Sequence, residues 1–281
     1  MELVDKKTNN TESPVVSIII VNYNSGELLG NCVNSLFWHL EIEFEVIVYD
    51  NFSTDQSILS LSENCRVKII PGKENLGFAR ANNLAVRHST GQFLHFLNPD
   101  VEVNDSLNDC YRQILDSHTN AIWVTGITDE SGTIQKNRHL VPRIGNIFRY
   151  FLKQPDIAYW NLGASVIVHA EAFRKMGGWP EDYFMYAEDL DFFYTAYRIG
   201  LPVYYPDAAL MHIGQGVTSK IWSAEQRAMI IERSFRKFYR KYNASWEYLI
   251  IRPLQLFYIL FNEPSTFLLY SKVFVKTLFI R

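Results

Sequence analysis

Residues 15–26 read VVSIIIVNYNSG, and this stretch decides the fold. Its first seven residues are apolar except for one serine, which predicts a strand buried on both faces. The polar run from Asn22 to Gly26 then breaks the strand. Apolar residues recur at helical spacing between Leu28 and Phe37, so a helix is expected directly afterwards. A buried strand, a short polar link and a helix make the first unit of an α/β fold.

The same alternation continues along the first hundred residues. We expect strands over 44–49, 67–70 and 93–97, and a helix over 77–88. Ser53 and Thr54 are typical N-terminal caps, and they predict a further helix through Leu61. Strands and helices that alternate with short links predict a central, mostly parallel sheet flanked by helices on both faces.

The second half is less regular. We expect strands over 121–125, 164–168 and 203–205, a turn over 129–132 and a helix over 188–199. Residues 138–156 have no clear period, which predicts a mobile loop over a site. From Ile221 onward the pattern is helical. The chain therefore divides into a polar tail over 1–14, expected to be disordered, an α/β domain over 15–220 and a C-terminal helical region over 221–281.

Composition excludes several classes of protein. The 281 residues carry a net charge of −3, so we expect no nucleic-acid partner. Three scattered cysteines, Cys32, Cys65 and Cys110, form no metal pattern and indicate a reducing compartment. The N-terminus lacks the apolar core of a signal peptide, and no apolar run reaches the ~18 residues of a spanning helix. We expect a cytoplasmic protein.

Polar clusters follow three of the expected strands, at Asn22 to Ser25, Asp50 to Asp55 and Asn98 to Asp100. Ligands of open parallel sheets sit beyond the carboxyl ends of the strands, so these clusters should converge in space. One such cluster alone is typical of a capped turn between a strand and a helix. Three together predict a binding site.

Five motifs occur in order along the chain. They are Asn22-Tyr23-Asn24, Asp50-Asn51-Phe52-Ser53-Thr54-Asp55, Glu74-Asn75-Leu76-Gly77-Phe78-Ala79-Arg80-Ala81-Asn82-Asn83, Asn98-Pro99-Asp100 and Glu188-Asp189-Leu190-Asp191. Together they resemble the family 2 glycosyltransferases, and more narrowly their bacterial rhamnosyltransferase-like branch, over about 15–216. The resemblance implies a GT-A nucleotide-sugar-binding fold, with 15–220 as the catalytic domain.

The resemblance also implies a donor site. Asp50 would accept a hydrogen bond from the nucleotide base, and a carboxylate suits the imide N–H of uracil or thymine. Gly77 would let the backbone approach the ligand closely, and Arg80 would pair with diphosphate. The remaining donor-binding residues implied are Asn22, Tyr23, Asn24, Asn75, Asn82 and Asn98. The residue types alone leave other roles open: a helix cap for Asp50, a packed aromatic for Tyr23 and a solvated arginine for Arg80.

Asn98-Pro99-Asp100 stands where the family has Asp-x-Asp. The resemblance implies that Asp100 binds a divalent cation, Mg²⁺ or Mn²⁺, which prefers oxygen ligands and bridges phosphates. It implies His212 as a further ligand, through neutral imidazole, followed by a flexible loop containing Gly214, Gly216, Thr218 and Ser219. Asn98 departs from the family pattern, since only one acid remains. An Asn-Pro turn and a buried structural histidine are the alternatives.

Glu188 and Asp189 begin the expected helix, and the resemblance implies that one of them is the general base. We assign Asp189 as the base, Glu188 as an acid that orients the acceptor and Asp191 as structural. Acids at a helix start also complement the helix dipole, which is the alternative for all three. The resemblance implies that the segment around Trp179 cradles the acceptor, and a core tryptophan is the alternative there.

Two apolar stretches, 249–261 and 266–280, are separated by Asn262-Glu263-Pro264. Each is too short to span a bilayer. Lys272 and Lys276 share a helical face, and upstream basic residues, Arg233, Arg236, Lys237, Arg240 and Lys241, form a patch. An interfacial helix pair on an anionic inner membrane surface, a helical cap and a homodimer contact all remain open.

The resulting hypothesis is an inverting hexosyltransferase that serves cell-surface polysaccharide synthesis, such as that of O-antigen. The acceptor would be a hydroxyl of a saccharide or a lipid-linked molecule. Thymidine-linked rhamnose is the first candidate donor, and uridine-linked sugars are the alternative. A nucleotidyltransferase is disfavoured because residues 22–26 contain no Lys or Arg. A non-catalytic sugar-nucleotide-binding scaffold is disfavoured by the paired acids Glu188 and Asp189.

Overall fold

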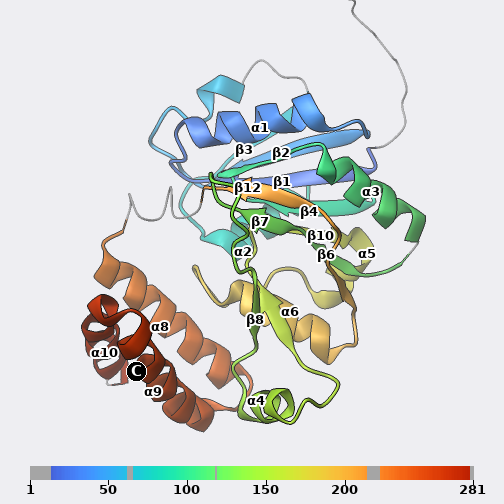
Figure 1. The fold of residues 1–281 in the computed structure, drawn as a ribbon. Helices are drawn as coiled ribbons and strands as arrows, with labels where there is room; N and C mark the ends of the chain where they lie inside the picture. The colour runs from blue at the N-terminus through green and yellow to red at the C-terminus, as the bar shows by residue number, and fades with distance from the viewer. Residues whose placement is uncertain (1–13, 62–65, 118, 214–221, 279–281) are drawn as a thin grey trace, which may run out of the picture.

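The computed structural model describes residues 14–61, 66–117, 119–213 and 222–278. At its centre is a seven-stranded sheet in the order β11-β6-β10-β4-β1-β2-β3 (Figure 1). The strands are β1 (Val16–Asn22), β2 (Phe44–Asp50), β3 (Val67–Pro71), β4 (Phe93–Leu97), β6 (Ile122–Val124), β10 (Ser165–His169) and β11 (Val203–Tyr204). β1 is parallel to β2 and β4, whereas β10 is antiparallel to β4 and β6. The predicted mostly parallel sheet is confirmed.

Helices cover both faces of this sheet, which explains why β1 is apolar along its length. Ile18 and Ile20 pack on one face against α1 (Glu27–His39) and α3 (Ser106–Ser117). Ile19 packs on the other face, where α2 (Phe78–Val86), α5 (Ala170–Met176) and α6 (Glu188–Arg198) contribute to the core. Figure 1 shows α1 and α3 above the sheet and α6 below it. The layered α/β arrangement is thus confirmed.

Two small sheets complete the domain. One has the order β5-β12-β7, from β5 (Val101–Glu102), β12 (Ala209–His212) and β7 (Gly126–Thr128). The other pairs β8 (Arg138–Leu140) with β9 (Tyr159–Asn161). β12 runs antiparallel to β5 and sets His212 opposite Val101. This register brings His212 beside the residue that precedes Val101, which is Asp100.

The helix expected from Ser53 to Leu61 is wrong, because the structure has only the short 3-10 turn η1 (Leu59–Leu61) there. A side chain from another loop binds the backbone N–H groups at the start of this segment. Asn24 Oδ1 accepts from the N–H groups of Thr54 at 2.7 Å and Asp55 at 3.3 Å. Ser, Asp and Asn side chains that bind nearby backbone groups favour such loops over helices.

The mobile loop expected over 138–156 is also wrong. This segment contains β8 and the helix α4 (Ile144–Phe151). One buried side chain fastens it: Asn146 Nδ2 donates to the carbonyls of Val141 and Ala158, and Asn146 Oδ1 accepts from the Ala158 N–H. Val141 and Ala158 are fully buried beneath the helix. A polar anchor of this kind leaves no periodic signal in the sequence.

Three helices end the described chain: α8 (Ala224–Lys241), α9 (Ser245–Asn262) and α10 (Pro264–Leu278). They lie together at one side of the α/β domain (Figure 1). Aromatic residues of α8 and α9, such as Phe238 and Tyr248, share a core with Tyr183 and Leu190 of the domain. Within the described residues, no helix combines the length and apolar character needed to cross a bilayer.

Candidate active site

A cavity of about 570 Å³ opens at the carboxyl ends of β1 and β4. Three parts of the chain line it: the polar strand ends, the segment before α6, and the C-terminal helices. The lining residues are Val21, Tyr23, Asn51, Asn75, Phe78, Asn98, Pro99, Asp100, Leu162, Met185, Tyr186, His212, Trp222, Ala224, Arg227, Ile231, Glu263, Thr266, Leu269 and Tyr270. The predicted convergence of polar clusters at this edge therefore occurs for residues of the first, second and fourth motifs.

Asp100 and His212 lie together at the wall of this cavity. Nε2 of His212 lies 3.4 Å from Oδ1 of Asp100, and only 12% and 10% of the two side chains are exposed. The strand β12 fixes the pair, because the N–H of Ile213 donates to the Asp100 carbonyl. Nδ1 of His212 is buried and has no hydrogen-bond partner among the described residues. The nitrogen that faces Asp100 is Nε2, so Nε2 is the atom that would share a ligand with this carboxylate.

A carboxylate oxygen and an imidazole nitrogen at this spacing fit a divalent cation. The pair supplies two protein ligands, and the described part of the chain contains no cluster of three or more His, Cys, Asp or Glu residues arranged for a metal. The remaining coordination positions would fall to phosphate oxygens and water. Asn98, whose N–H donates to the Ala164 carbonyl at 2.9 Å, lines the same cavity.

Asn51, which was not among the predicted site residues, organises the part of the cavity wall that contains Asn75. Its amide donates to Asn75 Oδ1 at 2.9 Å, and its Oδ1 accepts from the Leu76 N–H at 2.8 Å. Asn75 Oδ1 accepts in turn from the Gly77 N–H. Asn51 therefore fixes the loop that presents Asn75 to the cavity. Its place in the polar cluster after β2 was the signal that could have found it.

Gly77 has a structural reason to be glycine. Its φ is +78°, and an added Cβ would lie 1.9 Å from the carbonyl oxygen of Phe184. The N–H of Phe78 donates to that same oxygen at 3.2 Å. The backbone at Gly77 thus makes its close approach to the segment before α6. This contact holds α2 against that segment.

Asn22, Asn24 and Asp50 are absent from the cavity lining and bind one another's loops. The Asn22 amide donates to Asp50 Oδ1 at 3.0 Å, and the N–H of Ser53 donates to the same carboxylate at 3.3 Å. Asn22 is fully buried, whereas Tyr23 beside it lines the cavity. This network fixes the Asp50 carboxylate at the end of β2, close to the edge where Tyr23 and Asn51 face the cavity.

Three further residues singled out from the sequence lie away from this cavity. Arg80 pairs with Glu181 at 3.4 Å, and both side chains are about half exposed. The Asn82 amide donates to the Phe78 carbonyl within its own helix. Trp179 is 1% exposed and stacks on Phe192, with ring centroids 4.2 Å apart.

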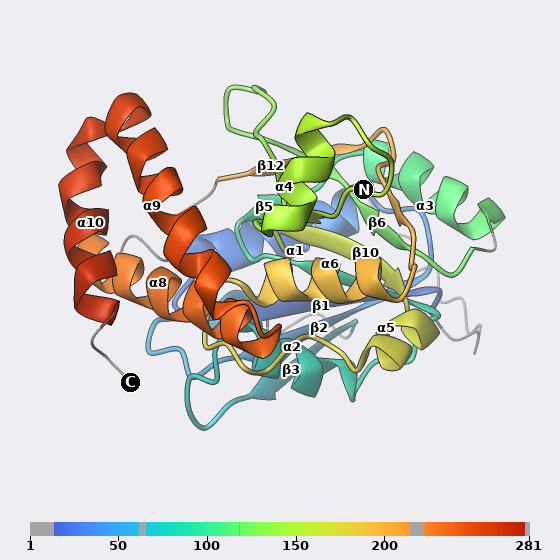
Figure 2. The same ribbon diagram turned by 90° about the horizontal axis from the view of Figure 1, so that it is seen from below.

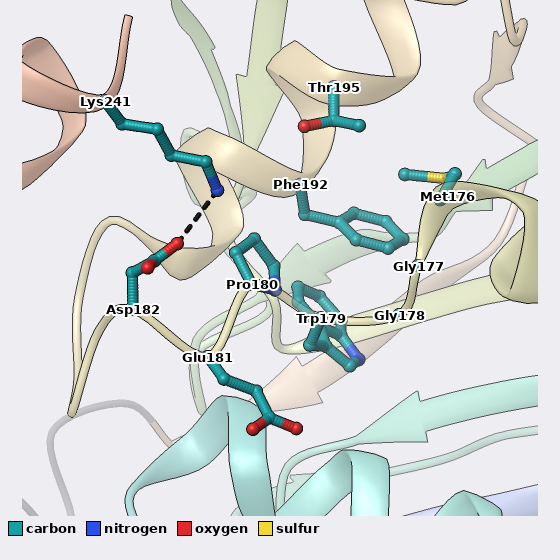
Figure 3. Close-up of a pocket in the computed structure, with 10 residues that line it drawn as sticks. All are labelled: Met176, Gly177, Gly178, Trp179, Pro180, Glu181, Asp182, Phe192, Thr195 and Lys241. Atoms are coloured by element: carbon teal, nitrogen blue, oxygen red, sulfur yellow. Dashed lines mark hydrogen bonds and ion pairs between the residues drawn. The ribbon is translucent and has the colours of Figure 1, made fainter.

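Trp179 borders a second cavity, of about 420 Å³ (Figure 3). Figure 3 shows Phe192 beside the indole and the Lys241 ammonium across the cavity, paired with Asp182 at 2.9 Å. Two of the charged side chains at this second cavity are thus paired with each other. Trp179 belongs to the core between α2 and α6, with its edge at the surface of this cavity.

The acids Glu188 and Asp189 begin α6, directly after two residues with a strained backbone conformation. Tyr186 and Ala187, just before them, both have φ of +65°, a conformation that costs non-glycine residues free energy. Burial raises the pKa of Asp189 to about 6, and backbone N–H groups of Leu190, Asp189 and Gly163 oppose that rise. Burial and the neighbouring Asp189 raise the pKa of Glu188 above its usual value.

The acids in the first turn of α6 differ in their hydrogen bonds and in their distance from the cavity-lining residues. Oε2 of Glu188 is buried and has no hydrogen-bond partner within the described ranges. Met185 and Tyr186, immediately before the pair, line the 570 Å³ cavity, as does Leu162 beside Gly163. Asp191, by contrast, is fully buried and bonded to Lys241 and Tyr242. Glu188 and Asp189 themselves are not among the lining residues of that cavity. Carboxylates with raised pKa values near a cavity are candidates for acid–base chemistry.

The chain is similar to several curated proteins. It is 28% identical to the low-salt glycan biosynthesis hexosyltransferase Agl10 of Haloferax volcanii over 68% of this chain and 64% of that protein. It therefore spans just under two thirds of that relative's length. It is 26% identical to the N-acetylglucosaminyl-diphospho-decaprenol L-rhamnosyltransferase of Mycobacterium tuberculosis, over 70% of this chain and 76% of that protein.

Solved structures share the fold. The mannosyltransferase PcManGT of Pyrobaculum calidifontis, in complex with GDP-Man and Mn²⁺, matches with a TM-score of 0.57 and 20% identity over 96% of this chain and 77% of that one. TarS 1–349 of S. aureus in complex with UDP-GlcNAc matches with a TM-score of 0.57 and 20% identity, over 78% and 65% of the two chains. The expected GT-A fold is confirmed.

The model of the family described as glycosyl transferase family 2 matches residues 17–177, more than half of the chain. That range includes the polar ends of β1, β2 and β4, with Asp100 of the cavity. This protein belongs to glycosyl transferase family 2.

Proposed function

We propose that this protein is a metal-dependent inverting glycosyltransferase that moves a sugar from a nucleoside diphosphate to an acceptor hydroxyl. The observation that carries the proposal is the buried Asp100–His212 pair at the wall of a cavity large enough for such a donor. Membership of family 2 supplies the reaction class. Solved neighbours in complex with nucleotide sugars and Mn²⁺ support the donor and cation classes.

The donor would lie along the sheet edge. Asp50, fixed by Asn22 and the Ser53 N–H, would accept from the imide N–H of the base. Tyr23, Asn75 and Asn98 would contact the nucleotide sugar from the cavity wall. Asn24 and Gly77 would act indirectly, since they fix the loops that carry these contacts. The surface position of Arg80 gives no support to a diphosphate contact.

A divalent cation held by Asp100 and His212 would neutralise the negative charge that develops on the departing diphosphate. Asp189 would accept the proton of the acceptor hydroxyl as that hydroxyl attacks the anomeric carbon. A single displacement inverts the configuration at this carbon. With a pKa of about 6, Asp189 is mostly ionised at neutral pH and still basic enough to accept a proton. Glu188 would orient the acceptor beside it.

Two relatives support the proposed donor and acceptor classes. The mycobacterial relative is by name an L-rhamnosyltransferase acting on a lipid diphosphate, which favours thymidine-linked rhamnose and a lipid-linked acceptor. A relative in Escherichia coli is by name a UDP-glucose-dependent glucosyltransferase with a lipid-diphosphate acceptor, so uridine-linked sugars are the alternative donor. Both names describe sugar transfer to a lipid diphosphate, and the relative in Haloferax volcanii is by name a glycan biosynthesis hexosyltransferase. Glycan biosynthesis is therefore the process we assign to this protein.

Substitution of Asp100 tests the proposal. Isothermal titration of the protein with dTDP and UDP, with and without Mn²⁺, should show cation-dependent binding. Asp100→Asn should weaken that binding by roughly tenfold or more, because a charged ligand to cation and diphosphate is lost. Donor hydrolysis should fall in parallel. Asp105→Asn is the matched control, since that carboxylate is 86% exposed and absent from the cavity lining. Equal Mn²⁺-dependent binding by the wild type and Asp100→Asn would refute the proposal.

A further inference from the structure

The distribution of charged and apolar residues in α9 is the reverse of the distribution usual for a helix on the surface of a soluble domain. Its two charged residues, Glu247 and Arg252, are buried. Its exposed residues are almost all apolar, and they recur with helical spacing along one face. These residues, which we name the α9 stripe, are Trp246, Leu249, Ile250, Pro253, Leu254, Phe257, Tyr258 and Phe261.

The α9 stripe is large and continuous. Leu254, Phe257, Tyr258 and Phe261 are each 60–69% exposed. From Trp246 to Phe261 the stripe runs for about 22 Å along the helix axis. No charged side chain interrupts it, because every residue of α9 lies in the described ranges and both of its charged residues are buried. Exposed apolar patches of this kind mark surfaces that contact a partner or a membrane.

A second helix close to α9 also exposes apolar residues. α4 begins next to α9, where the N–H of Ile144 donates to Oε2 of Glu247. Its residues Phe148, Phe151 and Leu152 are 64–74% exposed. Figures 1 and 2 agree that α4 and α9 lie at the same end of the molecule, the end that faces the viewer in Figure 2.

The charged residues of α9 are fully used inside the protein. Glu247 forms an ion pair with Arg143 of the segment before α4, with a nitrogen–oxygen distance of 2.9 Å. Arg252 forms an ion pair with Glu232 of α8, and less than about a tenth of either side chain is exposed. These pairs fix the rotation of α9 about its axis. The apolar side must therefore point outward.

The charge around the α9 stripe is positive. Residues 222–278 contain nine Lys and Arg residues against four Asp and Glu residues, a net charge of +5, whereas the whole chain carries −3. Arg236 and Arg240 line a cavity of about 250 Å³ together with Leu249 of the stripe. Arginines beside an apolar surface suit phosphate groups at the edge of a hydrocarbon layer.

We propose that α9 lies in the plane of a bilayer that contains anionic lipids, with the α9 stripe among the acyl chains. Arg236 and Arg240 would contact lipid phosphates at the rim. Basic and apolar side chains together are the signature of an interfacial helix. The charge favours a bilayer over a second copy of this chain, because a twofold contact through the stripe would bring the arginines of both copies towards each other.

The position of the stripe connects membrane binding to the reaction. Phe261 at its end lies two residues before Glu263, which lines the 570 Å³ cavity with Leu269 and Tyr270 of α10. A bilayer that receives α9 would therefore pass close to the cavity. The acceptor would then be a lipid-linked molecule delivered along the membrane, and this last inference alone rests on the proposed function.

Vesicle binding by the full chain tests the proposal. Sedimentation with vesicles of phosphatidylcholine, alone or mixed with phosphatidylglycerol, should show binding that is strongest with the anionic lipid and weakens as salt is added. Phe257→Glu and Leu254→Glu should each lower the partition coefficient by about tenfold or more, since an apolar contact is replaced by a charge. Arg240→Gln should remove part of the preference for the anionic lipid.

Matched controls separate the stripe from exposed apolar residues in general. Ile134 is 79% exposed and lies outside α4 and α9, so Ile134→Glu should bind vesicles like the wild type. Sedimentation velocity without lipid should give the same molecular mass for the wild type and Phe257→Glu. Vesicle binding that is absent in the wild type, or unchanged in Phe257→Glu, would overturn the proposal. A wild-type dimer that Phe257→Glu dissociates would assign the stripe to a second copy and overturn it too.

The vesicle assay contains neither donor nor acceptor, so its failure is distinguishable from failure of the proposed reaction. A chain that binds vesicles but shows no Mn²⁺-dependent nucleotide binding would refute the reaction alone. A chain that binds nucleotide but ignores vesicles would refute membrane docking alone.

Discussion

At the scale of single residues, Asp189 and Glu188 show how a fold can set the acidity of neighbouring carboxylates. Both stand at the start of α6, where the helix N-terminus favours negative charge. Burial works in the opposite direction and raises the pKa of each. Asp189 receives backbone N–H bonds, whereas Oε2 of Glu188 has no partner within the described residues. Backbone N–H groups therefore limit the rise in the pKa of Asp189.

The pH dependence of transfer follows from the pKa of Asp189. If Asp189 is the base, the reaction needs its ionised form, so kcat should fall as the pH drops through about 6 and level off above. Asp189→Asn should lower kcat by roughly 10²–10⁴-fold and leave donor affinity nearly unchanged. The measurement is a pH profile of kcat with a matched titration of donor binding. Retained turnover in Asp189→Asn would contradict the assignment.

A stability measurement on Asp189→Asn distinguishes loss of the base from loss of folding. The folded protein binds the Asp189 proton more tightly than an unfolded chain with a pKa near 3.8. The ionised form therefore costs stability as the pH rises from about 4 through 6. Asp189→Asn removes this cost, so its free energy of unfolding at neutral pH should equal or exceed that of the wild type. A less stable variant would mean that the carboxylate is structural.

Residue types and strand order predicted that the clusters at 22–25, 50–55 and 98–100 gather at the sheet edge, and the family resemblance added Asn75 and His212. Neither could predict the contacts of each side chain. Tyr23, Asn75, Asn98, Asp100 and His212 all line the cavity. Asn22 and Asn82 have the same kind of side chain as Asn75, yet they bond within the protein. Whether an asparagine faces a cavity depends on rotations of strand and helix that a single sequence does not encode locally.

At the scale of elements, the contact between α2 and the segment before α6 joins the donor side of the cavity to the acids. Gly77 lets the two backbones meet, and Asn83 strengthens the junction through bonds to the N–H and carbonyl of Trp179. The cavity-lining residues Asn75 and Tyr186 lie on either side of this contact. The packing of α2 therefore sets the width of the site.

Gly77→Ala should lower the free energy of unfolding by roughly 3 kcal/mol, because its Cβ would lie 1.9 Å from the Phe184 carbonyl oxygen. Gly132→Ala is a matched control: its φ of +81° is nearly that of Gly77, and no atom lies within 4 Å of its added Cβ. The control should cost about 1 kcal/mol. Urea denaturation measures both, and equal losses would show that the Phe184 contact carries no energy.

The central elements could be predicted because their signals are local. β1, β2 and β4 are mainly apolar runs, and α1 has a clear helical period, so their limits fell within a few residues of those expected. The segment after β2 could not be predicted, because the side chain of Asn24 binds its N–H groups from another loop. α4 escaped prediction for a related reason, since the single buried Asn146 holds its ends.

At the scale of the whole molecule, the cavity joins the two halves of the structure. The sheet edge contributes the Asp100–His212 pair, and α8 and α10 contribute the opposite wall through Ile231 and Tyr270. A ligand held between these walls would stabilise the folded chain as a unit. Binding to the folded state alone raises the free energy of unfolding with ligand concentration.

Melting temperature should therefore report the donor. At about a hundred times its dissociation constant, a nucleotide with Mn²⁺ would add about 2.7 kcal/mol, which corresponds to a rise in Tm of roughly 5–10 °C. We expect dTDP and dTDP-rhamnose to give the largest rise and UDP-sugars a smaller one. A scan over nucleoside diphosphates checks the order, and a larger shift with UDP-sugars would replace the first donor by the alternative.

The wall supplied by α10 has a consequence for how the protein is made. A ribosome finishes all strands of the central sheet long before it reaches Tyr270, so a nascent chain can build the floor of the site while its far side is still unsynthesised. A chain that ended just before Glu263 would have a folded sheet but would lack the cavity wall that α10 supplies. Its cavity would be open on that side. During translation, the central sheet can thus form before the part of the chain that completes the site has been synthesised.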